Sequence, residues 1–143
     1  MPDHAGLSPQ AHADLRVRTD RSAALGDAVM SCLVVPTEFR RVQDEYPILF
    51  RRTPERDDYL ALALFGLRNG ENLFLQGERW DARYLPLAMD IQPLLIGRAG
   101  PDDTSRQVHI DLASPRIDCS GEGVRLFDAE GQATPWLEAA TAR

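Results

Sequence analysis

The first candidates for acid/base chemistry are His109 and Asp111, which stand two residues apart in an alternating segment. Alternate residues of a strand share a face, so the two side chains would lie side by side and could form a proton-transfer pair. The sequence places no nucleophile beside them, and a metal site would need more ligands than this pair supplies. We therefore favour the simpler interpretation, a solvated polar face of a sheet.

A second candidate is the loop of residues 118–123, which contains Cys119 and Ser120. The serine lacks the G-x-S-x-G pattern of a nucleophile elbow, and the loop's two glycines are too few for a dinucleotide-binding fingerprint. Cys119 is predicted to react more readily than Cys32, whose apolar neighbours predict burial, and no disulfide is expected between them. We expect no catalytic residue, no metal site and no cofactor.

The best candidates for ligand contact are Trp80, Arg83 and Tyr84, because aromatic residues beside an arginine are common at recognition surfaces. The alternative is that Trp80 and Tyr84, at helical spacing, pack on a sheet, and large aromatic side chains are usually mostly buried. The arginines of residues 51–58 are balanced by acidic residues of the same segment, which favours a solvated loop over an anion site.

The composition limits the classes of function. The chain has 143 residues, is 43% hydrophobic and carries a net charge of −6, which predicts one domain with a real core. A negative chain is a poor binder of nucleic acid or anionic lipid. We expect no nucleic-acid partner and no membrane insertion. Two cysteines without an export signal predict the reducing environment of the cytoplasm.

The clearest positioning elements lie in residues 46–84. Residues 59–67 are apolar on both faces, which predicts a central strand, although their leucines and alanines also suit a helix. Asn69-Gly70 follows, which is the strongest short signal for a hairpin with a type I′ turn. That hairpin would place Phe65 opposite Phe74.

The remaining elements predict an α+β fold, with an antiparallel, meander-rich sheet and a few short helices. Residues 1–28 are predicted to be a flexible N-terminal arm that includes a short edge strand, and residues 29–143 a single domain. Further strands are predicted at residues 32–35, 47–52, 94–96, 107–112 and 123–127. Helices are predicted at residues 38–45, with Thr37 as N-cap, within 80–92, and after Thr134, with Pro135 in the first position.

An ordered series of short motifs resembles the bacterial SapC family, which is named from a surface-layer locus. The resemblance covers nearly the whole chain, and it is the shared order of the motifs that makes it specific. The motifs are His12-x-Asp14-Leu15-Arg16-Val17, Val35-Pro36-x-Glu38-Phe39, Tyr46-Pro47-Ile48-Leu49-Phe50, residues 62–67, Gly70-Glu71-Asn72-Leu73-Phe74, Trp80 with Tyr84-Leu85-Pro86, Ser114-Pro115, Leu126-Phe127-Asp128 and Thr134-Pro135-Trp136-Leu137.

The resemblance implies little chemistry, since the family brings no catalytic residues with it. Its genes often lie near those for outer-membrane uptake receptors, cupin-like oxygenases and halogenase-like proteins, which implies an accessory role in nutrient uptake or in modifying a partner. Family members typically continue into a further helical segment, so the resemblance also implies a short or truncated member. A homodimer is then expected, with Trp136, Leu137 and an exposed strand edge in its interface.

Three classes of function follow from these observations. The first is a non-enzymatic accessory protein that binds a ligand or a protein partner. The second is an enzyme, or an enzyme subunit, whose chemistry depends on a partner or cofactor, for example one associated with an oxygenase or halogenase. The third is a structural assembly element. An ordered metal or cofactor in the purified protein would favour the second.

Overall fold

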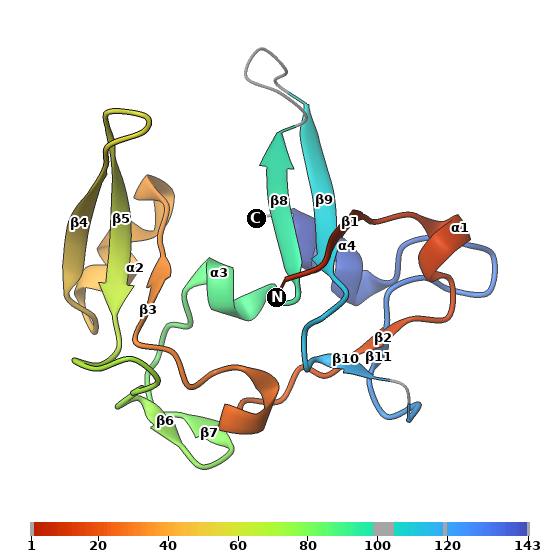
Figure 1. The fold of residues 1–143 in the computed structure, drawn as a ribbon. Helices are drawn as coiled ribbons and strands as arrows, with labels where there is room; N and C mark the ends of the chain where they lie inside the picture. The colour runs from red at the N-terminus through yellow and green to blue at the C-terminus, as the bar shows by residue number, and fades with distance from the viewer. Residues whose placement is uncertain (1, 99–104, 119, 143) are drawn as a thin grey trace. The chain divides into compact units, whose positions relative to one another are not determined.

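The computed structural model describes residues 2–98, 105–118 and 120–142, which form short antiparallel strands and short helices (Figure 1). This confirms the predicted α+β class. In chain order the elements are β1 (His4–Gly6), α1 (Pro9–His12), β2 (Arg16–Val17), η1 (Ala23–Leu25), β3 (Ser31–Leu33), η2 (Pro36–Glu38), α2 (Phe39–Gln43), β4 (Ile48–Thr53), β5 (Asp58–Leu64), β6 (Leu75–Gln76), β7 (Arg79–Trp80), α3 (Leu87–Asp90), β8 (Leu94–Arg98), β9 (Arg106–Asp111), β10 (Ile117–Asp118), β11 (Val124–Arg125) and α4 (Pro135–Thr141).

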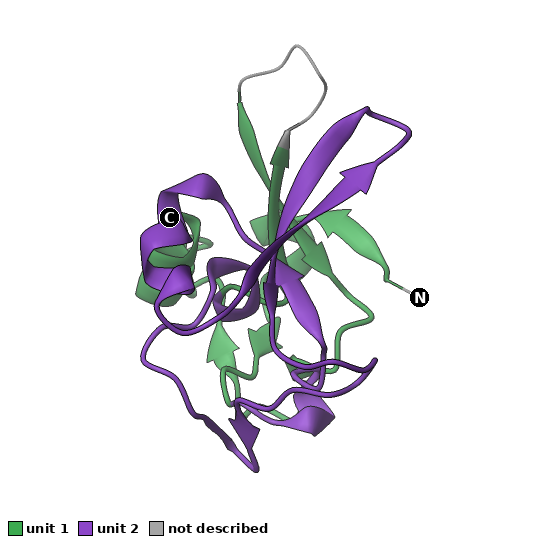
Figure 2. Cartoon of the chain, turned by 90° about the vertical axis from the view of Figure 1, so that its left-hand side faces the viewer, with its two compact units in different colours: residues 1–20, 91–143 green, residues 21–90 purple. Residues whose placement is uncertain are grey.

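The chain divides into two compact units (Figure 2). Unit 1 comprises residues 1–20 and 91–143, and unit 2 comprises residues 21–90. This division differs from the expected arm followed by one domain. Residues 4–17 contain β1, α1 and β2, whose strands pair with strands from the second half of the chain. Elements of two to four residues are too short to show a hydrophobic period, which is why the sequence pattern suggested an arm.

Unit 2 is built on the antiparallel sheet β3-β5-β4, with β5 in the centre as predicted. The alternation of side chains gives this sheet two different faces. Cys32, Ala63 and Ile48 are paired across the strands and face the core of unit 2. The next row, Leu33, Leu62 and Leu49, points to the opposite side.

The predicted type I′ hairpin at Asn69-Gly70 is wrong. β5 ends at Leu64, and the next strand, β6, begins only at Leu75. The turn at residues 68–71 is closed by the Glu71 N–H on the Arg68 carbonyl at 3.1 Å, and only its third residue, Gly70, has a positive φ, at 81°. A type I′ turn needs a positive φ at both central positions, so this is a type II turn.

Hydrogen bonds from side chains, and not a ladder between two strands, fix the conformation of residues 67–72. The Asn72 side-chain amide donates to the Asp27 carbonyl at 2.9 Å, and the Glu71 carboxylate accepts from the Leu67 N–H at 2.7 Å. The bond from Leu67 satisfies a backbone group of the predicted hairpin, and the bond to Asp27 ties the segment to a residue 45 positions away. Phe65 and Phe74 still become neighbours, with ring centroids 6.3 Å apart, but as packed rings of a wide loop.

Helices in unit 2 are shorter than the sequence suggested. The predicted helix at residues 38–45 is divided between η2 and α2, and Val35 occupies the N-cap position expected of Thr37. The reason is the Glu38 side chain, which bonds back to the Val35 N–H at 2.9 Å and thereby begins the turn earlier. Within residues 80–92, only α3 is helical, directly after Pro86.

Unit 1 contains two small sheets, with strand orders β1-β9-β8 and β10-β2-β11. The strands predicted at residues 94–96 and 107–112 are β8 and β9, and most of the loop predicted between them lies outside the described residues. The predicted edge strand near Arg16 is instead the central strand β2, flanked by β10 and β11. Ile110, on β9, is fully buried in the core of this unit.

The predicted C-terminal helix is confirmed as α4. Thr134 is its N-cap and accepts from the Leu137 N–H, and Pro135 opens the helix. Leu137 is buried in the core of unit 1, and Trp136 packs against the same core. The two residues expected at a dimer interface therefore contribute to the interior of their own unit.

Candidate functional site

Trp80 lies at the end of β7 and belongs to the aromatic core of unit 2. Its ring packs edge-on against Phe65, with centroids 5.0 Å apart. Its indole Nε1 donates to the Tyr46 hydroxyl at 2.8 Å. The indole has a single N–H donor, which this bond occupies, so Trp80 presents no polar group to a ligand.

Tyr84 also directs its polar groups inward. Its hydroxyl donates to the Glu38 carboxylate at 2.9 Å, and its N–H donates to the Glu45 carboxylate at 2.8 Å. The Arg41 guanidinium lies over its ring, 5.8 Å from the centroid, at the distance of a cation–π contact. Arg83 donates its N–H to Glu45 at 2.7 Å and has an exposed side chain. Of the three predicted contact residues, Arg83 is exposed, whereas Trp80 and Tyr84 are half-buried.

Glu38 is the hub of this network and is only 4% exposed. Besides the Tyr84 hydroxyl, its carboxylate accepts from the Val35 N–H and from the Leu87 N–H at 3.0 Å. The bonds join η2 and the residue directly before it to α3, whose Leu87 lies 49 residues after Glu38. A buried carboxylate that accepts from three donors of its own unit acts as a structural acceptor. Sequence reasoning missed this role, although Glu38 stands inside a family motif.

Tyr46 completes the network as a neutral phenol. Its hydroxyl donates to the Tyr84 carbonyl at 2.5 Å and accepts from Trp80. Burial raises the pKa of Tyr46 to about 12. The phenol therefore keeps its proton at neutral pH and serves as a bridge, because a proton-abstracting base would have to be ionised.

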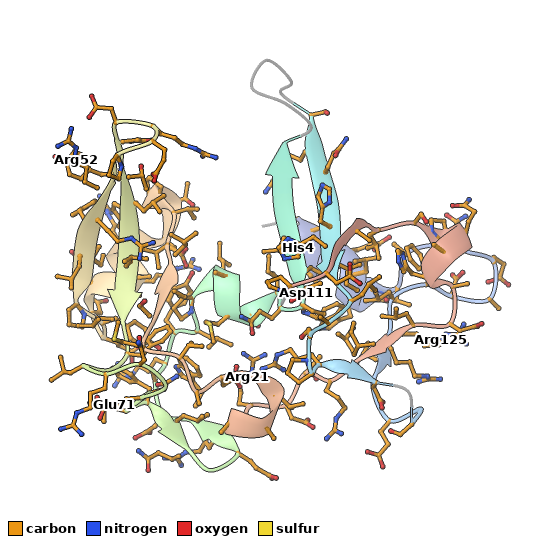
Figure 3. The ribbon with its side chains drawn as sticks, in the orientation of Figure 1. His4, Arg21, Arg52, Glu71, Asp111 and Arg125 are labelled. Carbon is orange, nitrogen blue, oxygen red and sulfur yellow. The ribbon has the colours of Figure 1, made fainter. Side chains whose placement is uncertain are left out.

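The His109–Asp111 pair does not form an acid/base couple. Both residues lie on β9, but the Asp111 carboxylate accepts from the backbone N–H groups of Asp3 and Ala113, at 2.8 and 3.0 Å. Asp111 is paired across the strands with His4 of β1, as Figure 3 shows. The carboxylate thus fastens β1 to the end of β9, which is a structural role.

The 118–123 loop is held by Asp118. Its carboxylate accepts from the Ser120 N–H at 2.8 Å, from the Ser120 hydroxyl at 2.6 Å, and from the Gly123 N–H. These hydrogen bonds lower the pKa of Asp118 to about 2. The Ser120 hydroxyl therefore donates a hydrogen bond to the carboxylate that closes the loop, which is a structural role. Cys119 lies outside the described residues.

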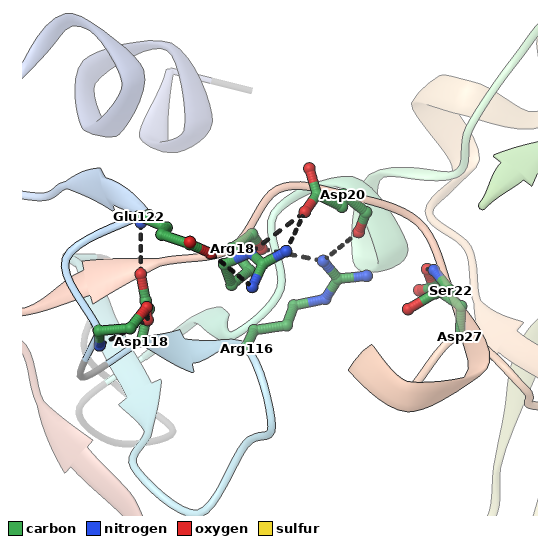
Figure 4. Close-up of polar contacts among 9 residues, drawn as sticks. Arg18, Asp20, Ser22, Asp27, Arg116, Asp118 and Glu122 are labelled. Atoms are coloured by element: carbon green, nitrogen blue, oxygen red, sulfur yellow. Dashed lines mark hydrogen bonds and ion pairs between the residues drawn. The ribbon is translucent and has the colours of Figure 1, made fainter.

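Beside this loop, unit 1 holds a cluster of charges (Figure 4). Arg116 is fully buried and donates to the carbonyls of Arg18 and Asp20, at 2.9 and 2.7 Å. The Arg18 guanidinium pairs with Asp20 at 2.6 Å and lies 3.6 Å from Glu122. The bond to Asp20 raises the pKa of Arg18 above its usual value. The cluster links β2, β10 and the loop that follows β10.

Two further features were not visible in the sequence. One is a cavity of about 400 Å³ in unit 1, which is lined by residues 10–16, 117, 118 and 121 and includes the buried His12 in its lining. Sequence reasoning placed His12 in the arm, although Ser8-Pro9 ahead of it is a helix-start signal. The other is the leucine-rich face of the unit 2 sheet, which we call the outer face. Leu33, Leu49, Leu60, Leu62 and Leu64 lie on it, together with Ser31 and Arg51.

Two leucines of the outer face, one on each edge strand, are exposed to solvent. Leu33 and Leu49 are each 50% exposed, and they flank Leu62 in one row across the three strands. Leucines on a solvated sheet face are commonly replaced by polar residues, because an antiparallel sheet with one wet side alternates between apolar and polar. Contiguous exposed apolar surface of this kind marks sites of protein contact.

Within the described part of the chain, no group of three or more histidine, cysteine, aspartate or glutamate residues is placed to hold a metal ion. None of the helices among those residues is long and apolar enough to cross a membrane. In comparisons with known proteins, the SapC family model matches residues 7–142. No curated protein and no solved structure matches the chain.

Proposed function

The chain belongs to the SapC family, and we propose that it is a non-enzymatic accessory protein that acts by binding another protein through the outer face of the unit 2 sheet. We place it in the cytoplasm and link it to nutrient uptake or to the modification of a partner. That link rests on the family alone. The observation that carries the binding role is the exposure of Leu33 and Leu49 in one apolar row.

The inward use of polar groups supports binding over catalysis. The side chains of unit 2 with acid/base potential in the family motifs are Glu38, Tyr46, Glu71 and Tyr84, and each is bonded within the protein. A general base must reach the proton that it abstracts. The outer face, in contrast, offers area and shape but no reactive group, which suits a contact surface.

The first occupant that we propose for this face is a second copy of the chain. In a two-fold contact the same patch meets itself, so like charges near the axis would face each other. The row Leu33–Leu62–Leu49 carries no charge, and its centre can therefore meet its own copy without burying like charges. We therefore propose a homodimer whose contact lies on the outer face and not at Trp136 and Leu137, which pack in the core of unit 1.

Sedimentation equilibrium at micromolar concentration tests this proposal. The natural chain should be a dimer, and Leu49→Arg should be a monomer, because an arginine in the apolar row would oppose itself across the two-fold axis. Leu67→Arg is the matched control, since Leu67 is 79% exposed but lies outside the sheet. Far-UV circular dichroism should be unchanged in both variants. A monomeric natural chain, or a dimeric Leu49→Arg variant, would contradict the proposal.

The accessory role has a separate test. Natural and Leu49→Arg chains are used as paired baits in a pull-down from the native host, with identification by mass spectrometry. A partner that is captured by the natural chain and by Leu67→Arg, but not by Leu49→Arg, supports binding through the outer face. A cofactor or metal retained stoichiometrically by the purified chain would instead favour an enzyme or an enzyme subunit.

A further inference from the structure

His12 is the most unusual polar side chain in unit 1, because it is buried and still has bonding capacity. It is the last residue of α1 and is 6% exposed. Its Nδ1 accepts from the Ser8 N–H at 3.1 Å. A backbone N–H can only donate, so Nδ1 is unprotonated and the neutral ring carries its proton on Nε2.

The Nε2–H of His12 makes no hydrogen bond within the described residues. It is not one of their fully buried, unpartnered side-chain atoms, so it is reached by solvent although the residue is buried. His12 lines the 400 Å³ cavity together with its neighbours in residues 10–16 and with residues 117, 118 and 121. This volume falls in the range of about 300–1,000 Å³ that is usual for small-ligand sites. A hydrogen-bond acceptor inside the cavity would satisfy the donor.

Arg16 supplies a second donor to the same cavity. It lies on β2, and its Nη1 donates to the Gly123 carbonyl at 2.9 Å, which anchors the side chain. A guanidinium has five N–H donors in a fixed fork, so one anchoring bond leaves others for a ligand. A positive group beside a neutral N–H donor is suited to a carboxylate, which accepts charge-assisted hydrogen bonds.

Two acidic residues also line the cavity and restrict what can enter it. The Asp118 carboxylate is turned to its own loop, where it accepts from Ser120 and Gly123. The Asp14 carboxylate is exposed and lies 3.6 Å from Arg125. Two carboxylates in the lining disfavour a ligand with several negative charges, because like charges repel.

The geometry points to a binding site in unit 1 for a small organic monocarboxylate, with its carboxylate on His12 and Arg16 and its apolar body against Leu15 and Ile117. Both of these apolar residues line the cavity and also pack against the core of unit 1. The site is independent of the outer face of unit 2. The proposed protein contact involves residues of unit 2 only, so this ligand site would be a second, separate binding function in unit 1.

Nuclear magnetic resonance of the histidine rings tests the site directly, with acetate, butyrate and inorganic phosphate as probes. Butyrate should shift the His12 ring signals saturably and at lower concentration than acetate, because its longer body buries more apolar surface. The exposed His4 serves as an internal reference and should not respond. Phosphate should shift His12 more weakly than butyrate does. The ring nitrogen shifts should also identify the Nε2–H tautomer in the free protein.

Two variants make the result specific. Ala11→Leu should abolish the butyrate response by filling the cavity, while Ala139→Leu, an exposed alanine of α4, should leave it unchanged. His12→Asn keeps an acceptor for the Ser8 N–H but removes the Nε2–H, because the shorter side chain carries its amide donors closer to the backbone. It should therefore weaken butyrate binding at least tenfold. No saturable shift at His12, a response that persists in Ala11→Leu, or phosphate binding as strong as butyrate binding would each overturn the assignment.

Discussion

Among the described residues, unit 2 buries the carboxylates of Asp27 and Glu38, and unit 1 buries the guanidinium of Arg116. Glu38 and Arg116 are satisfied in different ways. Glu38 in unit 2 accepts from two backbone N–H groups and a tyrosine hydroxyl. Arg116 in unit 1 donates to the carbonyls of Arg18 and Asp20. Each charge joins segments that are far apart in the sequence, so each unit is organised around a polar hub as well as an apolar core.

The two cores differ in the same way. Unit 2 packs Tyr46, Phe65, Phe74 and Trp80 into one aromatic group, whose polar atoms bond to each other or to backbone. The core of unit 1 is mainly aliphatic, and His12 beside it keeps an N–H for a cavity. In our two proposals, unit 2 offers an apolar surface for protein contact, whereas unit 1 offers a polar donor for a small ligand.

The largest effect is expected from Glu38→Ala. It leaves the Val35 N–H, the Leu87 N–H and the Tyr84 hydroxyl without an acceptor, and should lower the free energy of unfolding by on the order of 3–5 kcal/mol. Urea denaturation followed by Trp80 fluorescence, in a Trp136→Phe background, measures it. Glu45→Ala is the control, because half-buried Glu45 also accepts two N–H groups. An equal loss in both variants would remove the special role of Glu38.

Arg116→Ala is the corresponding change in unit 1. Two buried carbonyls lose charged donors, so the free energy of unfolding should fall by roughly 2–3 kcal/mol. Trp136 fluorescence in a Trp80→Phe background reports on this unit. Arg18→Ala, whose side chain is 36% exposed, should cost much less. If Trp80 and Trp136 report identical transitions in every variant, the two units unfold as one and the comparison fails.

A smaller effect is expected from Gly70→Val. Gly70 has a φ of 81° and open space around its Cβ position, so the cost comes from backbone strain and should be about 1–3 kcal/mol. Gly97→Val in β8 is the matched substitution in unit 1, with equally open space and no positive φ. It should be neutral or stabilising, because valine suits a strand. Equal destabilisation by both would show that lost space, not φ, sets the cost.

The smallest effect at neutral pH concerns Cys32. Burial raises the pKa of its thiol from 9.0 to about 12, so the folded state keeps a proton that the unfolded state loses. This contribution to stability is fully present below pH 9 and declines as the pH rises toward about 12. In a Cys119→Ser background, iodoacetamide should alkylate Cys32 slowly in the native protein and rapidly in urea. Rapid native alkylation at pH 8 would contradict burial of the thiol.

Much of the local structure could be predicted because its signals are local. β5 follows from residues that are apolar on both faces, β9 from clean alternation, and α4 from Thr134-Pro135 at its start. The hairpin failed because Asn72 bonds to Asp27, which lies 45 residues away, and no property of residues 65–74 reveals that partner. The binding role predicted for Trp80, Arg83 and Tyr84 stays a prediction. The sequence could not show that the indole of Trp80 bonds to Tyr46 and the hydroxyl of Tyr84 to Glu38, because those partners lie far away in the chain.

The sequence by itself determined the α+β class, the family, the positions of the main strands and the capped C-terminal helix. These depend on hydrophobic periods, turn residues and short motifs, which act over a few residues. Only the tertiary structure decided that Glu38 and Arg116 are buried hubs, that the first twenty residues belong with the last fifty, and that His12 lines a cavity. The physical reason is that each of these depends on hydrogen bonds or packing between segments distant in the chain, for which a single sequence carries no local signal.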